Sequence, residues 1–169
     1  AIKCPATKEG ITAMEELTAR GINVNATVSF SVPQALVTAQ ALERGMERAV
    51  RSGTAPERLH PYVTIMVGRV DDHMKRVAER DAVMIDPGYL SWAGIAVCKR
   101  ARELFLQRGF RSTLLAAAYR HHLHWSELIG AGAIQSIPYG WWKQFNGSDI
   151  TPPQTLAEPV ASEIVDTLR

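Results

Sequence analysis

Short apolar runs alternate with longer amphipathic segments along the chain, and this alternation predicts parallel β-strands with helices packed outside them. The predicted strands are rich in β-branched and small apolar residues, and they cover residues 1–4, 22–30, 62–67, 112–118 and 133–137. The predicted helices cover residues 8–20, 32–52, 90–107 and 156 onward, with a charged, partly helical stretch at residues 71–86. A chain of 169 residues corresponds to one domain by the usual relation between length and domain count.

The strand predicted at residues 22–30 carries its polar side chains on one face. Successive side chains of a strand point to opposite faces, so the residues of one parity form a polar row, namely Asn23, Asn25, Thr27, Ser29 and Ser31. The residues of the other parity are apolar, namely Val24, Ala26, Val28 and Phe30. A central parallel strand is normally buried on both faces, so the polar row needs hydrogen-bond partners or a wet cavity.

A barrel supplies such a cavity, because its interior opens at the carboxyl ends of the strands. The strand at residues 62–67 agrees in part, because Thr64 and Met66 would face inward while Val63, Ile65 and Val67 face helices. In the strand at residues 112–118, one parity is predicted to face inward and to bring Arg120 to the rim; it consists of Leu114, Ala116, Ala118 and Arg120. The alternative is a network of asparagines and threonines with a structural role only.

Charge and composition exclude several classes of function. The net charge is +2 at pH 7, without runs of lysine or arginine, so neither nucleic acid nor an anionic membrane is expected as a partner. There is no apolar run of the length of a membrane-spanning helix, and we expect no signal peptide. Cys4 and Cys98 lie far apart without metal or redox spacing, which favours a reduced, cytoplasmic setting. Glycine-rich nucleotide-binding motifs are also absent.

Three motifs together resemble those of the transaldolases, the Schiff-base-forming class I aldolase-type transferases of the pentose phosphate pathway. They are IKCPAT-x2-GI at residues 2–11, GIN-x-N-x-T-x3-S at residues 21–31 and VGRVD at residues 67–71. The resemblance implies an α/β fold of the TIM (β/α)8-barrel type, of which this chain would supply about the fourth to eighth strands with their helices. Residues 1–169 would then form a single domain, the C-terminal part of a barrel truncated at its N-terminus.

The resemblance also implies catalytic roles. Lys3 is similar to the Schiff-base lysine of the family's fourth strand, and its amine must be neutral to attack a ketone, a form that burial in a barrel mouth favours. Asn25 would bond the dihydroxyacetone hydroxyls or the carbinolamine, and Thr27 would hold a catalytic water near the imine. Apart from the resemblance, a lysine at position 3 is also compatible with a surface residue at a frayed chain end.

Phosphate binding follows from the same resemblance. Arg69 and Arg120 are similar to the family's two phosphate-binding arginines, whose fork-shaped guanidiniums suit a phosphate monoester. Thr64 stands where the family commonly has serine, and it keeps the hydroxyl. Met66 stands where an aromatic residue is usual and Ala118 where serine is usual, so one phosphate donor is lost.

Residues 120–124 read Arg-His-His-Leu-His, which raises the possibility of a zinc site with Glu127. Catalytic zinc sites rarely draw three ligands from so short a loop, so we favour a rim loop beside the phosphate site, without a metal. The stretch Asp71-Asp72-His73 is predicted to be a solvated helix start, where acids suit the helix dipole.

The predicted function is transfer of a dihydroxyacetone unit from sedoheptulose 7-phosphate or fructose 6-phosphate to an aldose phosphate, through a lysine imine and without a cofactor. The alternatives are a fructose-6-phosphate aldolase and a non-catalytic partial barrel that pairs with another chain. The open strand edge would meet the missing N-terminal part of the barrel or a second copy. The family's first three strands carry an aspartate and a glutamate for proton transfer, so the isolated chain is expected to be inactive.

Overall fold

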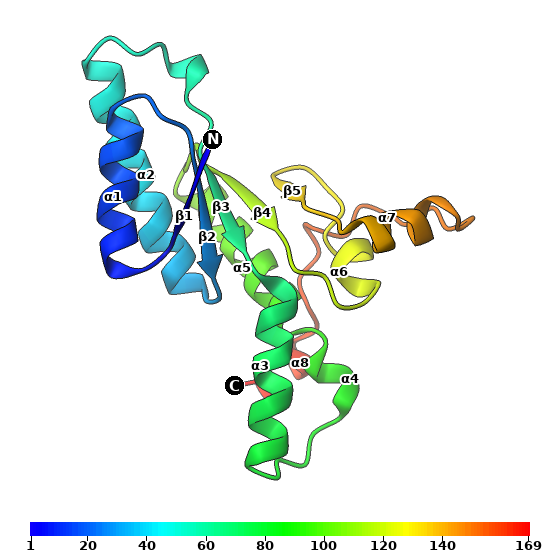
Figure 1. Ribbon diagram of the computed structural model, residues 1–169. Helices are drawn as coiled ribbons and strands as arrows, with labels where there is room; N and C mark the ends of the chain where they lie inside the picture. Colours follow the sequence, from blue (N-terminus) through cyan, green and yellow to red (C-terminus); the bar gives the residue numbers. More distant parts are fainter.

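The computed structural model describes all 169 residues and contains one parallel five-stranded sheet (Figure 1). The strands lie side by side in chain order, and they are β1 (Ile2–Pro5), β2 (Val24–Ser29), β3 (Tyr62–Ile65), β4 (Thr113–Ala116) and β5 (Ala133–Gln135). Every neighbouring pair is parallel. The α/β fold class is therefore confirmed, and the sheet is consistent with part of a TIM-type (β/α)8 barrel.

Helices alternate with these strands. The long ones are α1 (Lys8–Ala19), α2 (Val32–Arg51), α3 (Val67–Arg80) and α5 (Ala93–Gln107). The short ones are η1 (Pro56–Arg58), α4 (Pro87–Leu90), α6 (Leu123–Ser126), α7 (Tyr139–Asn146) and α8 (Ser162–Thr167). Thr7 caps α1 by accepting from the Gly10 N–H at 3.0 Å, and Ser31 caps α2 by accepting from the Gln34 N–H at 3.3 Å. None of the helices is both long and apolar enough to cross a membrane.

The core lies between one face of the sheet and the helices α1, α2 and α5 (Figure 1). The strand residues that face these helices are at most 1% exposed, and they are Val24, Ala26, Val63, Ile65, Leu114 and Ala116. Met14, Leu42 and Ile95 from the three helices belong to the same buried cluster. The other face of the sheet carries the polar row, and several of its side chains are half-buried or exposed.

The predicted alternation of β2 holds only as far as Thr27. Between Ala26 and Ser29 the pairing with β3 gains one extra residue, and Val28 adopts a left-handed conformation with φ 67°. Such a bulge reverses the alternation beyond it. Ser29 is consequently fully buried, whereas Val28 and Phe30 are exposed, so the prediction for these three residues was wrong.

The predicted orientation of β4 was also wrong. Leu114 and Ala116 face the helices and are 1% and 0% exposed. Their neighbours Thr113 and Leu115 pair with Tyr62 and Thr64 of β3 and so lie on the opposite face. Arg120 is not placed by strand parity, because β4 ends at Ala116 and the chain turns at Ala118, where φ is 66°.

The bounds of two elements differ from prediction. The predicted strand at residues 62–67 ends at Ile65, and α3 begins at Val67 rather than near Asp71. The last helix spans only Ser162–Thr167, although an amphipathic helix from residue 156 was predicted. Helix α3 projects beyond the carboxyl ends of the strands, with α4 beside it (Figure 1). The strand-to-helix turn is thus tight, and the VGRVD motif lies inside the helix.

Candidate active site

Polar side chains from three neighbouring strands lie together on the face of the sheet that carries the polar row. Lys3 of β1 pairs in register with Asn25 of β2, so the two lie next to each other on the same face of the sheet. The Thr64 hydroxyl of β3 donates to Asn25 Oδ1 at 2.6 Å. The sheet therefore brings together the predicted imine lysine and two predicted substrate-side residues.

Thr27 lies one pleat further toward the carboxyl end of β2. It is 8% exposed, and its hydroxyl lies 4.0 Å from Met66 Sδ, a weak O–H···S contact. Met66 is the residue between β3 and α3, so Thr27 and Met66 both lie where these strands end. The polar row thus continues to the carboxyl edge of the sheet, where active sites of parallel barrels form.

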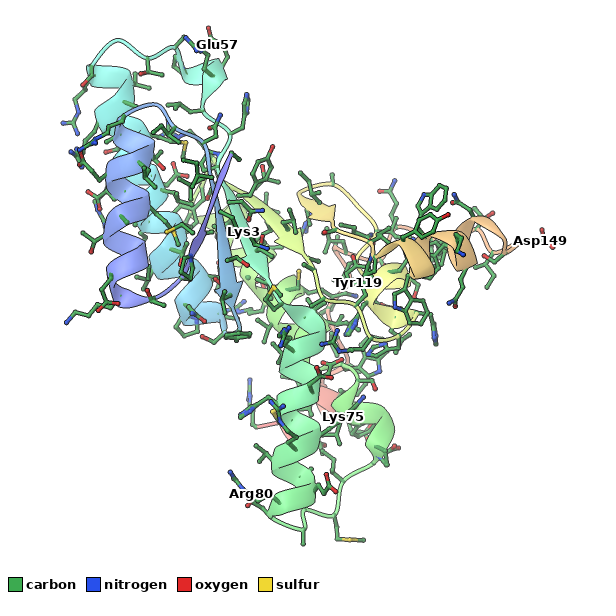
Figure 2. All side chains as sticks on the ribbon, in the orientation of Figure 1. Lys3, Glu57, Lys75, Arg80, Tyr119 and Asp149 are labelled. Carbon is green, nitrogen blue, oxygen red and sulfur yellow. The ribbon has the colours of Figure 1, made fainter.

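Lys3 is exposed, although the sequence predicted it to be buried (Figure 2). The reason is the position of β1, which pairs only with β2 and forms one edge of the sheet. Nothing in this chain covers the other side of that strand.

The two predicted phosphate-binding arginines differ in their contacts. Arg69, in the first turn of α3, is exposed and makes no hydrogen bond or ion pair through its side chain. The Arg120 guanidinium is held by Asp72, with Nε and Nη2 at 3.0 and 2.8 Å from Oδ2. Its Nη1 donates to the Ala118 carbonyl at 3.1 Å. Arg69 is therefore free to meet an anion, whereas Arg120 already has internal partners.

The start of α3 lies directly against the segment that carries Arg120. A Cβ at Gly68 would lie 2.0 Å from the Ala118 carbonyl oxygen and 2.7 Å from Arg120 Cγ. Only glycine permits this approach, which brings the residue before Arg69 against Arg120. The two arginines come from adjoining segments, and their sharing of one anion stays a prediction.

A buried carboxylate that was not predicted from the sequence lies near the close contact between Gly68 and residues 118–120, which we call the Gly68 crossing. Asp71 is fully buried, so the prediction of a solvated helix start was wrong for this residue. Its Oδ1 accepts from the Gly94 N–H at 2.8 Å, and its Oδ2 contacts His121 Nε2 at 2.9 Å and His124 Nε2 at 2.7 Å. The histidines were noticed in the sequence, but Asp71 lies 50 residues or more before them. Local spacing gives no signal for such a contact.

The hydrogen bonds of His124 determine its tautomer. The Arg120 N–H donates to His124 Nδ1 at 3.0 Å, so the ring proton must lie on Nε2 and point at Asp71. Burial lowers the pKa of the His124 imidazole, which favours this neutral form. Burial alone would raise the pKa of the Asp71 carboxyl, but hydrogen bonds from His121, His124 and Gly94 outweigh it and lower that pKa to about 2.

The donor atoms of Asp71, His121 and His124 lie within 4.8 Å of one another, a grouping that could hold a metal ion. The tautomer of His124 argues against this use. A metal ligand needs the Nε2 lone pair, and the proton would then move to Nδ1, where it would face the Arg120 N–H. The donor set fits a hydrogen-bonded network better than a cation.

Comparison with known proteins identifies the family. The chain matches the sequence model of the transaldolase/fructose-6-phosphate aldolase family over residues 1–168. It is 34% identical to a probable transaldolase of Moorella thermoacetica over 139 residues, which cover 82% of this chain and 49% of that protein. It is 31% identical to a transaldolase of Neisseria meningitidis serogroup C, covering 85% and 45% of the two chains.

A transaldolase of Renibacterium salmoninarum is 30% identical over 171 residues, which cover 99% of this chain and 42% of that protein. The chain thus spans about half the length of the curated relatives it matches. Since the family model matches nearly every residue, the chain belongs to the transaldolase/fructose-6-phosphate aldolase family.

Proposed function

We propose that the complete protein transfers a dihydroxyacetone unit from a ketose phosphate to an aldose phosphate through an imine on Lys3, in the cytoplasmic pentose phosphate pathway. The observation that carries the proposal is the adjacency of Lys3, Asn25 and Thr64 on one face of three neighbouring strands. Family membership supports the same class of reaction.

Lys3, Asn25 and Thr27 each have a role in this proposal. The Lys3 amine adds to the ketose carbonyl, and loss of water from the carbinolamine gives the imine. Asn25, whose amide Nδ2 makes no internal hydrogen bond, donates to the hydroxyls of the bound sugar or to the carbinolamine. Thr27 holds the water that enters and leaves at the imine carbon. The C–C bond between the carbons α and β to the imine carbon then breaks as the β-hydroxyl loses its proton, which releases an aldose phosphate and leaves an enamine on Lys3. The enamine attacks the acceptor aldehyde, whose oxygen takes up a proton, and addition of water to the resulting imine releases the product and restores the Lys3 amine.

Phosphate recognition is assigned to the two arginines. Arg69 offers an unpaired guanidinium in the first turn of α3, where the partial positive charge of the helix end also favours an anion. Arg120 contributes from the adjoining segment. The groups that transfer protons during C–C cleavage are expected on strands that precede Lys3 in the family, so the activity is proposed for the complete protein.

The free edges of the sheet agree with this assignment. β1 and β5 each have one neighbour, and their outer edges expose unpaired backbone groups. We expect these edges to pair with the rest of a barrel or with a second copy of the chain.

Fructose-6-phosphate aldolase is the second candidate, because the matched family includes both activities. The two differ in the fate of the enamine, which an aldolase protonates and releases as free dihydroxyacetone. The test is to incubate the complete protein with fructose 6-phosphate, with and without an aldose phosphate acceptor. Turnover that requires the acceptor indicates a transferase, acceptor-independent release of dihydroxyacetone indicates an aldolase, and no reaction in either mixture would contradict both.

A further inference from the structure

Two adjacent carboxylates of α3 hold the two ends of Arg120. Asp72 binds its guanidinium through Nε and Nη2. Asp71 acts on the other end through His124, which accepts the Arg120 backbone N–H on Nδ1. Backbone and side chain of one residue are thus both tied to the same helix, the helix that also carries Arg69.

The contact between Asp71 and His124 has a direct consequence for Arg120. With Asp71 Oδ2 accepting from Nε2, the imidazole must present a lone pair at Nδ1. Without the carboxylate, the other tautomer would direct an N–H at the Arg120 N–H, 3.0 Å away, and the two donors would repel. His121 supports the same arrangement, because its ring packs on that of His124 with centroids 3.8 Å apart.

The backbone needs this support at this point. Ala118 has φ 66°, which few residues other than glycine adopt, and α6 does not begin until Leu123. Residues 117–120 lie outside any regular element, so the position of Arg120 depends on contacts rather than on the sheet. The His124 acceptor and the Gly68 crossing are the contacts that fix its backbone.

We propose that Asp71 and His124 are positioning residues that aim Arg120 at the phosphate of the substrate, so that they set affinity for phosphorylated sugars without touching them. This inference rests on the proposed function, in which Arg120 binds phosphate. It assigns to the buried Asp71–His124 pair a role in substrate recognition in addition to its contribution to packing.

The test uses two substitutions of His124 that each keep one of its hydrogen bonds. In His124→Asn the amide oxygen occupies nearly the place of Nδ1 and can still accept from Arg120. In His124→Gln the amide nitrogen reaches the place of Nε2 and can still donate to Asp71, but Arg120 loses its acceptor. His122→Gln is the matched control, because His122 is exposed in the same loop and its side chain makes no hydrogen bond.

The readouts, made on the complete protein, are inhibition by inorganic phosphate, and KM and kcat for fructose 6-phosphate and for unphosphorylated fructose. For His124→Gln we expect phosphate inhibition to weaken and KM for the sugar phosphate to rise by ~10-fold, a loss typical of one hydrogen bond at a charged site. Affinity for fructose and kcat should change little. His124→Asn should stay within ~3-fold of the wild type, a residual loss of under 1 kcal/mol.

The positioning role would be overturned if His124→Gln and His124→Asn weakened phosphate inhibition equally. It would also be overturned if His124→Gln raised KM equally for fructose 6-phosphate and fructose. Where His124→Gln does not fold, Asp71→Asn replaces it and should weaken phosphate inhibition in the same way; unchanged inhibition would overturn the proposal.

Arg120→Lys separates this inference from the function on which it rests. If Arg120→Lys leaves phosphate affinity unchanged, Arg120 is not a phosphate ligand; if it weakens affinity while His124→Gln does not, only the positioning role fails.

Discussion

The polar face of the sheet and the Asp71 cluster, which consists of Asp71, His121 and His124, are built in opposite ways. Lys3 and Asn25 lie on regular strands with their side chains partly open to solvent, and one hydrogen bond links Asn25 to Thr64. Asp71 and His124 are fully buried, and each has both of its polar ends occupied. Groups that must bind or react with a substrate need polar atoms without internal partners, whereas groups that hold a backbone in place need all their polar atoms paired. The first region has the features of a reacting surface and the second those of a support.

The largest effect should come from Lys3→Ala. If Lys3 is the nucleophile, activity of the complete protein should fall by at least ~10⁴-fold, as expected for loss of a catalytic nucleophile. Because Lys3 is exposed in this chain, the free energy of unfolding should change by less than about 0.5 kcal/mol. The control is Lys8→Ala, an exposed lysine at the start of α1. A large loss of stability with retained activity would place Lys3 in the supporting class instead.

Arg69→Ala should have the next largest effect. Loss of a charge-assisted hydrogen bond costs about 1.5–3 kcal/mol, so KM for fructose 6-phosphate should rise by roughly 10- to 150-fold. KM for unphosphorylated fructose should stay constant. Arg76→Ala, an exposed arginine on the same helix, controls for the loss of one positive charge. A rise of equal size for both sugars would remove Arg69 from phosphate binding.

Asp71→Asn should also lower stability, in addition to weakening phosphate inhibition. The new amide NH₂ would face the Nε2 atoms of His121 and His124, leaving buried donors without an acceptor at a cost of about 1–3 kcal/mol. Asp72→Asn is the matched control, because its ion pair with Arg120 is partly exposed and contributes at most about 1 kcal/mol. Urea unfolding of both variants measures the difference. Equal stabilities would mean that the buried network does not support the fold.

The pH dependence of unfolding should show the same network. The pKa of His124 is lowered in the folded state, so its contribution is complete above about pH 6.5, the value for an exposed histidine, and declines as the pH falls below it. The pKa of Asp71 is lowered to about 2, so its contribution persists down to about pH 4 and is lost as the pH approaches 2. Urea titrations between pH 7.5 and 5 give the free energy of unfolding at each pH. The plot of this free energy against pH should therefore have a different slope for the wild type and for His124→Asn, and identical slopes would contradict the assignment.

Regular elements could be predicted from sequence because they depend on local pattern. The alternation of strands and helices, the caps Thr7 and Ser31, and the shared face of Asn25 and Thr64 follow from local pattern and end signals. The consecutive order of the five strands was implied by the family resemblance. The bulge at Val28 could not be predicted, because a β-branched residue is unfavourable at positive φ and gives no sign of the reversal.

Long-range pairing explains the remaining misses. The sequence indicated a helix start near Asp71, where an aspartate would face solvent, but α3 begins at Val67, and Asp71 is buried because Gly94 and two histidines from a later segment surround it. The partner of Arg120 was missed for the same reason, since Asp72 lies 48 residues before it. Lys3 was predicted to be buried from the expected barrel, whereas its exposure depends on the open edge of β1.

The most direct test of the central claim is to trap the imine. The complete protein is reduced with borohydride in the presence of fructose 6-phosphate, digested, and the modified peptide identified by mass spectrometry. The proposed function predicts a single adduct on Lys3 that forms only with substrate and is absent from Lys3→Ala. Addition of the sugar to any other lysine, or an unchanged adduct in Lys3→Ala, would contradict it.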